Sequence, residues 1–152
     1  YQDQIAAVKF LQDDHAGMRQ RLTQYFKCEI KDEPVALHKL LDECFKRYFA
    51  GEQELFALPI CYWGSPVAKA VQEAMRKIHY GATATYTDVA RLANYPIAVR
   101  AVASAVGQNP FVIVSPCHRV IRKDGGIGGY SAHGGLDTKR KLMQLEKIPL
   151  NK

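Results

Sequence analysis

The stretch "TYTDVARLANYPIAVRAVASAVGQNP" (85–110) constrains the fold of this chain more than any other. It predicts two short helices, roughly 88–93 and 97–107, joined by the four-residue link "NYPI" (94–97), with Thr87 as N-cap of the first. Such a link is typical of helix-turn-helix geometry. The second helix consists of small residues and one long cation, Arg100. This composition fits tight core packing, and it equally fits a helix that lies against a narrow groove and probes it with Arg100.

Hydrophobic periodicity and capping residues predict the other elements. We expect strands over 5–11 and 110–116, and helices over 15–26, 35–51, 65–81 and 137–147. The caps and turns of these elements are expected at Pro34 (first position of its helix), Ser65 (N-cap), Gly81 (C-cap) and Asp124-Gly125 (hairpin). In the last helix we expect Leu142 and Leu145 to face inward, and the cations Lys139, Arg140 and Lys141 to face outward.

Charge is divided unevenly along the chain. Residues 1–58 hold 8 Lys and Arg against 10 Asp and Glu, whereas residues 59–152 hold 13 against 5. The stretch 51–66 contains Gly, Pro and Trp with little periodicity and is interpreted as a linker. We therefore predict an α+β protein with a small N-terminal α/β domain (1–58) and a basic, mostly helical C-terminal domain (59–152). The basic charge indicates a polyanionic partner such as nucleic acid, the alternative being a solvated surface.

Composition excludes several other classes of protein. The apolar fraction is 47 % without a low-complexity tract, which is typical of a globular chain. We find no apolar run near the roughly 18 residues of a membrane span, and no secretory signal. Four scattered cysteines without a CxxC pair favour a reducing compartment, cytoplasmic or nuclear. A zinc site of Cys28, His38 and Cys44 is conceivable but fits no standard finger. Because the chain begins at Tyr1, its N-terminal domain is expected to be truncated.

The stretch "IVSPCHRVI" (113–121) carries the clearest chemical signal. Cys117 is a buried structural thiol, a metal ligand or a nucleophile, and spacing alone does not decide. A thiolate nucleophile needs a nearby base or cation, and His118 and Arg119 follow directly. Adjacent residues of a strand point to opposite faces, so Cys117 and His118 can cooperate only if the chain turns or a water links them. Pro116 makes such a turn plausible.

A histidine that acts as a base is usually held by a carboxylate. The basic half of the chain offers five candidates that spacing cannot rank: Glu73, Asp88, Asp124, Asp137 and Glu146.

Five segments resemble those of the O6-alkylguanine-DNA alkyltransferase family and follow one another along the chain in the family's order. "PCHRV" (116–120) is similar to its active-site signature, and "YGATATYTDVA" (80–90) to its YGE-x-x-SY-x-x-(L/V)A segment. The others are "VRAVASAVGQNP" (99–110), the arginine-bearing recognition helix, "GGIGGYS" (125–131), the following loop, and "KRKLMQLE" (139–146), the closing helix. The first 60 residues fit the family's variable N-terminal domain only loosely.

The resemblance implies a role for individual residues. Cys117 would accept the alkyl group, His118 would act as base through a water, and Glu146 would hold His118. Asn109 would fix the turn between the recognition helix and the active-site strand. Tyr86 would press on the target phosphate and help protonate the leaving guanine. The remaining implied contacts to DNA or the flipped base are Arg100, which would fill the gap left by that base, Ala101 and Ala103, the carbonyls of Cys117 and Val120, and Tyr130 and Ser131.

The implied activity is single-turnover repair of alkylated DNA. The alkyl group of O6-alkylguanine, with O4-alkylthymine as a further candidate, would pass irreversibly to Cys117 in a suicide reaction. The implied partner is double-stranded DNA bound through the minor groove, with the target base extruded. We expect no cofactor, no zinc, no membrane and a monomeric protein. Departures from the family pattern are Val67 and Ala68 after the helix start, Ser115 before the proline, and the longer loop "YSAHGGLD" (130–137).

Three alternatives remain at this point. A relative of the family lacks the cysteine and only marks lesions, which the presence of Cys117 disfavours. A helix-turn-helix regulator should carry several polar base-reading side chains, not one arginine. A cysteine hydrolase would turn over an ester or amide and would not depend on DNA.

Overall fold

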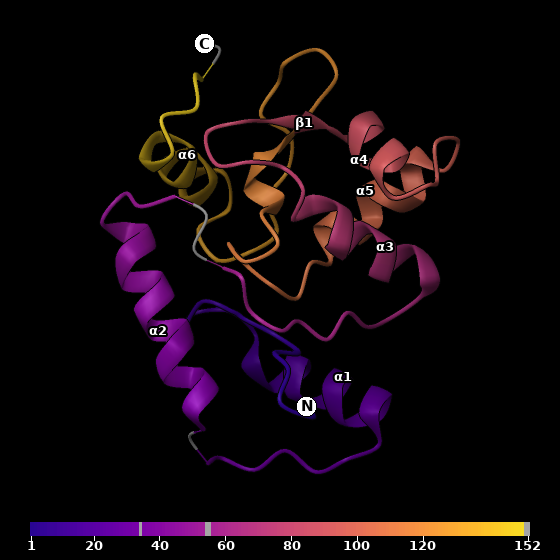
Figure 1. Ribbon diagram of the computed structural model, residues 1–152. Coiled ribbons are helices and arrows are strands. Elements are labelled where there is room, and N and C mark those ends of the chain that lie inside the picture. The colour runs from indigo at the N-terminus through magenta and orange to yellow at the C-terminus, as the bar shows by residue number, and fades with distance from the viewer. Residues whose placement is uncertain (34, 54–55, 151–152) are drawn as a thin grey trace.

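The computed structural model describes residues 1–33, 35–53 and 56–150, and within them it is an α+β protein. The elements in order are α1 (His15–Phe26), α2 (Ala36–Phe49), α3 (Pro66–Met75), β1 (Ala84–Thr85), α4 (Tyr86–Leu92), α5 (Val99–Gly107), η1 (Cys117–Arg119), β2 (Val120–Ile121) and α6 (Gly135–Leu145). In Figure 1 the N-terminal segment, α1 and α2 form one half, and α3 to α6 form the other. No helix in these three ranges is long and apolar enough to cross a bilayer.

The predicted helices are present, with corrected ends. Pro34 lies outside the described residues, and α2 begins at Ala36. Helix α3 begins as predicted, because the Ser65 hydroxyl accepts a hydrogen bond from the Ala68 amide at 3.2 Å. It ends at Met75, so the prediction of Gly81 as its C-cap was wrong. The Ile78 amide bonds the Met75 carbonyl at 3.1 Å, a bond to the third preceding residue that tightens the chain into a turn.

The N-cap of α4 is Thr85, not Thr87 as predicted. Its hydroxyl accepts the Asp88 amide at 3.1 Å, and the Asp88 carboxylate accepts the Thr85 amide at 2.9 Å. This reciprocal pair is a capping box, which requires a polar acceptor three residues after the cap. Thr87 has Ala90 at that position, so it cannot form one. The shift places Tyr86 at the first helical position, facing the loop around Gly128.

The two predicted strands are wrong, and a different pair forms the sheet. β1 and β2 are parallel, with Ala84 opposite Val120 and Thr85 opposite Ile121. Segments 5–11 and 110–116 contribute only isolated bridges, one of them Val8 to Phe111. The predicted hairpin at Asp124-Gly125 is a closed loop, in which the Arg122 amide bonds the Gly126 carbonyl at 2.8 Å.

Segment 110–116 is not a strand because it folds into two three-residue turns. The Val114 amide bonds the Val112 carbonyl at 2.8 Å around Ile113, whose φ is +68°. The Cys117 amide bonds the Ser115 carbonyl at 2.8 Å around Pro116. The first turn is strained, since a β-branched residue at positive φ is rare and costs about 1–3 kcal/mol. The chain therefore reverses before Cys117 and does not run on as an extended ladder.

The hydrophobic core joins both halves of the molecule. One cluster lies among α3, α4 and α5 and includes Val71, Val89, Val102 and the Cys117 side chain. A second cluster combines N-terminal and C-terminal residues: Ile5, Met18, Cys44, Leu58, Ile60, Trp63, Phe111 and Val114. A third brings Tyr48 of α2 against Ile113 and Leu142. The N-terminal helices thus pack on the segment that leads into Cys117, and the division at residue 58 stays a prediction.

Candidate active site

A tight turn brings Cys117 and His118 onto the same structural unit. Pro116 has φ −80° and ψ 71°, and the next three residues form the single 3₁₀ turn η1. Both side chains are buried. Because the chain turns here, as Pro116 predicted, the rule that neighbouring strand residues point to opposite faces does not apply to Cys117 and His118.

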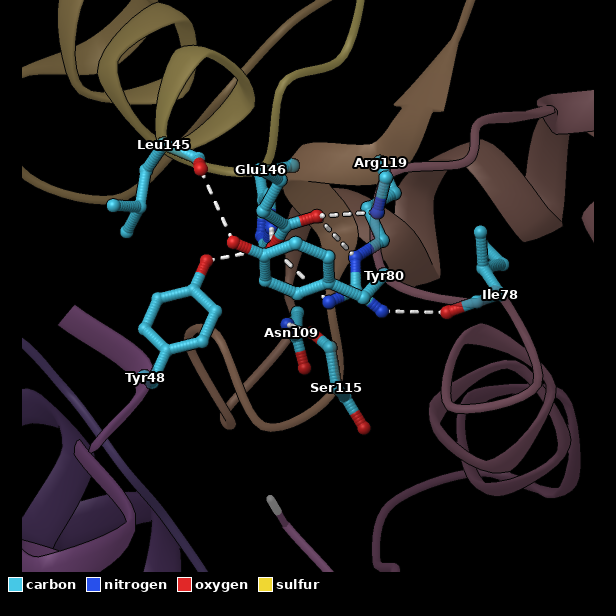
Figure 2. Close-up of polar contacts among 10 residues, drawn as sticks. Tyr48, Ile78, Tyr80, Asn109, Ser115, Arg119, Leu145 and Glu146 are labelled. Atoms are coloured by element: carbon cyan, nitrogen blue, oxygen red, sulfur yellow. Dashed lines mark hydrogen bonds and ion pairs between the residues drawn. The ribbon is translucent and has the colours of Figure 1, made fainter. Parts of the chain in front are cut away.

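Asn109 holds this turn from behind. Its side-chain amide donates to the carbonyls of Ser115 at 2.7 Å and Phe111 at 3.1 Å, and its oxygen accepts the Phe111 amide at 3.1 Å. The buried Ser115 donates its hydroxyl to the Gln72 carbonyl at 2.8 Å. The segment before Cys117 is thereby tied to α3 and to itself, and Figure 2 shows Asn109 and Ser115 side by side.

Cys117 lines a cavity of about 290 Å³. The other lining residues come from α4, α5 and the loop after β2: Tyr86, Ala103, Val106, Gly107, Gly129, Tyr130 and Ser131. The Ser131 hydroxyl donates to the Gly107 carbonyl, which ties this loop to the end of α5. The buried Tyr130 hydroxyl has no hydrogen-bond partner among the described residues. A mostly apolar cavity with a few polar groups beside a thiol suits a small planar ligand.

His118 is held from its far side by Glu146. Its Nε2 lies 2.6 Å from Glu146 Oε1, and both side chains are wholly inaccessible to solvent. Because a carboxylate only accepts, Nε2 carries the proton and Nδ1 is the basic nitrogen. Within the described residues His118 Nδ1 has no hydrogen-bond partner, so its lone pair is available to take a proton. Of the five carboxylates that the sequence offered, Glu146 is the one that reaches His118.

Arg119 binds the Glu146 carboxylate. Its guanidinium donates through Nε to Glu146 Oε2 at 2.7 Å and through Nη2 to Oε1 at 3.0 Å. A further bond from Nη1 to the Ile78 carbonyl, at 2.5 Å, fixes the guanidinium on the turn after α3 (Figure 2). From the sequence, Arg119 was expected to lower the pKa of Cys117. In the structure its guanidinium instead makes a forked contact that orients Glu146.

These contacts set the protonation states of the three groups. Burial raises the pKa of the Cys117 thiol, against a hydrogen bond from Asn109 and the charge of Lys139. Burial lowers the pKa of His118, although Glu146 opposes this effect. Burial alone would raise the pKa of Glu146, but the bonds from His118 and Arg119 outweigh it and hold the pKa at about 2. At neutral pH the site therefore contains a thiol, a neutral imidazole and a carboxylate.

Lys139 was predicted to face outward, and that prediction was wrong. Its side chain is completely buried. The ammonium donates to the carbonyls of Val120 at 2.6 Å and Gly129 at 3.2 Å, which stand on either side of the 121–128 loop. Burial lowers its pKa to about 8, while the neighbouring Cys117 opposes the shift. Lys139 therefore places a largely protonated cation near the thiol and joins the two ends of the 121–128 loop.

The residues implied to contact DNA lie in three places. Tyr86, Ala103, Tyr130 and Ser131 line the cavity with Cys117. Arg100 and Ala101 lie on the exposed surface of α5, outside the cavity lining. The Val120 side chain is buried in the core, so only its carbonyl, which already accepts Lys139, can face a ligand.

Three features of this site were missed from the sequence alone: the Tyr48 contact to Glu146, the direction of Arg119, and the burial of Lys139. The alternative zinc set is not formed, because nowhere in the described ranges do three His, Cys, Asp or Glu side chains gather as a metal site requires.

Comparison with known proteins agrees with this geometry. Residues 66–148 match the family described as "6-O-methylguanine DNA methyltransferase, DNA binding domain". A methylated-DNA--protein-cysteine methyltransferase of Haemophilus influenzae is 43 % identical over 120 residues, 78 % of this chain and 66 % of that protein. The match thus spans just under two thirds of that relative's length.

Two solved structures are also similar. The crystal structure of Mycobacterium tuberculosis OGT in complex with DNA is 38 % identical, with a TM-score of 0.67 over 73 % of this chain and 69 % of that chain. The crystal structure of the O6-methylguanine methyltransferase of the same organism is 30 % identical, with a TM-score of 0.76 over 98 % of this chain and 85 % of that chain. The second likeness extends over the N-terminal half as well as the matched domain.

Proposed function

The chain belongs to the 6-O-methylguanine DNA methyltransferase family, and from this premise we propose that it repairs alkylated DNA by irreversible transfer of the alkyl group to Cys117. The observation that carries the proposal is the arrangement of one thiol that lines a cavity, one imidazole with a free basic nitrogen, and one carboxylate that holds the imidazole. The substrate is O6-alkylguanine in double-stranded DNA, with O4-alkylthymine as a second candidate.

The proton of Cys117 passes to His118 Nδ1, through a bridging water, because burial keeps the thiol protonated until a base takes its proton. The thiolate then attacks the alkyl carbon, so that the sulfur–carbon bond forms as the bond from carbon to O6 breaks. The guanine anion takes a proton from the Tyr86 hydroxyl, and the proton on His118 returns to Tyr86 through solvent. The net products are a thioether and guanine, and each molecule acts once.

The base has to leave the duplex, because O6 cannot be attacked inside the stack. The cavity beside Cys117 is bordered by two aromatic side chains, Tyr86 and Tyr130, which suit the faces of an extruded purine. Ser131 and the carbonyls of Cys117 and Val120 supply polar contacts for its edge. Asn109 keeps the turn in place while the base enters.

Helices α4 and α5 would act as a helix-turn-helix that docks α5 in the minor groove. Small residues, among them Ala101 and Ala103, allow the α5 backbone to approach the sugar–phosphate walls closely. Arg100 is exposed on this helix and would occupy the space that the extruded base leaves. The excess of Lys and Arg over residues 59–152 supports an affinity for phosphate.

The decisive experiment is intact mass and peptide mapping after incubation with duplex DNA that contains O6-methylguanine. We expect a stoichiometric gain of one methylene on the Cys117 peptide, with guanine restored in the DNA. Cys117→Ala should abolish transfer and keep lesion binding, whereas Cys28→Ala, which removes an exposed thiol, should leave transfer unchanged. Lesion binding without a mass change would indicate a lesion-marking protein, and catalytic turnover without DNA would indicate a hydrolase.

Arg100→Ala tests the contribution of base extrusion. We expect it to slow repair of duplex DNA by at least about tenfold while reaction with free O6-methylguanine changes less than twofold, because the free base needs no extrusion. An equal loss with both substrates would contradict the role given to Arg100.

A further inference from the structure

A side chain of the N-terminal half reaches the buried carboxylate of the site. Tyr48, on the last turn of α2, is 2 % exposed, and its hydroxyl donates to Glu146 Oε1 at 2.6 Å. Figure 2 shows Tyr48 coming from the purple helix toward Glu146, which follows α6. The two residues are 98 positions apart in the chain. This contact therefore exists only when the two halves are docked.

The oxygen that Tyr48 binds is the one that His118 uses. Oε1 accepts His118 Nε2 at 2.6 Å, the Tyr48 hydroxyl at 2.6 Å and Arg119 Nη2 at 3.0 Å. Oε2 accepts Arg119 Nε at 2.7 Å. Three donors on one oxygen leave the carboxylate little freedom to rotate, so Tyr48 helps to fix the plane in which the imidazole is held.

Tyr48 also limits the charge that Glu146 offers to His118. Burial raises the pKa of Tyr48 far above its ordinary value, so its hydroxyl stays protonated and donates at every working pH. The hydrogen bond from the Tyr48 hydroxyl to Oε1 is strongest while His118 is neutral, because a charged imidazolium would compete with it for the negative charge of the carboxylate. The hydroxyl therefore favours neutral His118, the form that can accept the proton of Cys117.

We infer that Tyr48 is a positioning residue for alkyl transfer, which acts on His118 through Glu146 and makes the reaction depend on docking of α2. The inference rests on the proposed function. The charged and titratable groups that act on His118 and Glu146 are Arg119 of η1, Lys139 of α6, Tyr80 before β1 and Tyr48 of α2. Of these, only Tyr48 belongs to the N-terminal half.

Tyr48→Phe tests the inference because it removes the hydroxyl and keeps the ring. The rate of alkyl transfer is measured against pH, and His118 is titrated by NMR in the DNA-free protein. A hydrogen bond to a charged group is worth about 1.5–3 kcal/mol, so we expect both the acid limb of the rate profile and the His118 titration to move up by about one pH unit. Tyr48→Leu, a second variant without the hydroxyl, should move both in the same direction.

Tyr80→Phe is the matched control. Tyr80 makes an edge contact with Tyr48, with ring centroids 6.2 Å apart, but its hydroxyl donates to the Leu145 carbonyl at 3.1 Å and not to the carboxylate. We expect this variant to leave both pH dependences in place. The inference is overturned if Tyr48→Phe matches the unsubstituted protein in both, or if Tyr80→Phe moves them equally. If the unsubstituted protein transfers no alkyl group, the proposed function fails, and the NMR titration then reports separately whether Tyr48 acts on His118.

Discussion

The turn before Cys117 depends on the side chain of Asn109, and Asn109→Ala measures how much. The substitution removes three buried hydrogen bonds with the main chain, two to the carbonyls of Phe111 and Ser115 and one from the Phe111 amide, in addition to the contact with the Cys117 thiol. Asn109 is buried, so water cannot replace the amide without opening the segment. Ile113, at φ +68°, lies between the bonded residues and is held in its strained conformation by them.

The expected loss follows from these contacts. Three hydrogen bonds at about 1 kcal/mol each, together with the main-chain groups left unpaired, are worth about 4–5 kcal/mol. Relaxation of Ile113 returns about 1–2 kcal/mol of strain once the bonds are gone. We therefore expect the free energy of unfolding to fall by about 3 kcal/mol. That is a large share of the roughly 5–15 kcal/mol that stabilises a typical domain.

Urea denaturation followed by tryptophan fluorescence measures the loss, because the chain has a single tryptophan, Trp63. With a slope of about 2 kcal/mol/M, the midpoint should fall by about 1.5 M. Gln108→Ala is the matched control, since this neighbouring side-chain amide is exposed and its one bond among the described residues goes to the Ser104 hydroxyl, at 3.2 Å; the substitution should cost less than about 0.5 kcal/mol. A loss under about 1 kcal/mol for Asn109→Ala would refute the reasoning that its amide holds the turn.

Two further predictions concern the charged groups of the site. Glu146 has a folded-state pKa of about 2, below its ordinary value of 4.5, so its charge stabilises the fold above pH 4.5 and that contribution disappears as pH falls from 4.5 to 2. The difference in unfolding free energy between the unsubstituted protein and Glu146→Gln should therefore narrow by on the order of 3 kcal/mol over that interval, as measured by urea denaturation; a constant difference would contradict it. Lys139→Met removes the cation near Cys117, so we expect the pH at which iodoacetamide labels this thiol to rise by about one unit and alkyl transfer to slow by about tenfold; unchanged labelling would show that Lys139 does not act on the thiolate.

The helices could be predicted from the sequence because their signals are local. Ser65 and Pro66 mark the start of α3 through contacts within one turn, and the apolar spacing of α1 and α2 is visible without tertiary context. The wrong N-cap of α4 was also a local error, since Asp88 identifies Thr85 as the capping-box partner. Helix identity thus follows from neighbours in sequence, and ends follow from specific side-chain bonds.

The strand predicted over 110–116 failed for the opposite reason. An apolar run shows that a segment is buried, but it does not show how its backbone groups are paired. Here the Asn109 side chain binds the carbonyls of the residues two and six positions later. These bonds hold the segment in turns, so it cannot extend and pair with another strand. The prediction for Lys139 was wrong for a similar reason. A charged side chain is normally exposed, but the carbonyls of Val120 and Gly129 provide hydrogen-bond partners that allow the ammonium to be buried.

The reactive residues of the candidate site could be predicted from the sequence, but the residues that hold them in place were harder to predict. Cys117 and His118 were evident as neighbours, and the family resemblance pointed to Glu146. Spacing could not choose Glu146 from five carboxylates, because the fold alone brings residues 28 positions apart into contact. Tyr48 was even less accessible, since its position on an apolar helix stripe explains its burial and says nothing about the partner of its hydroxyl.

Under the proposed function Cys117 reacts only once, and the opposed pKa shifts of Cys117 and His118 protect it until then. Burial raises the pKa of the thiol and lowers that of the imidazole, so proton transfer between them is uphill in the resting site. The ion pair forms only with help from charges on each side, Lys139 near the sulfur and Glu146 on the imidazole. Under the proposed function, an acceptor that cannot be regenerated thus rests as a thiol, which resists oxidants and stray electrophiles. It becomes a thiolate when an alkyl carbon is in place to take up the charge.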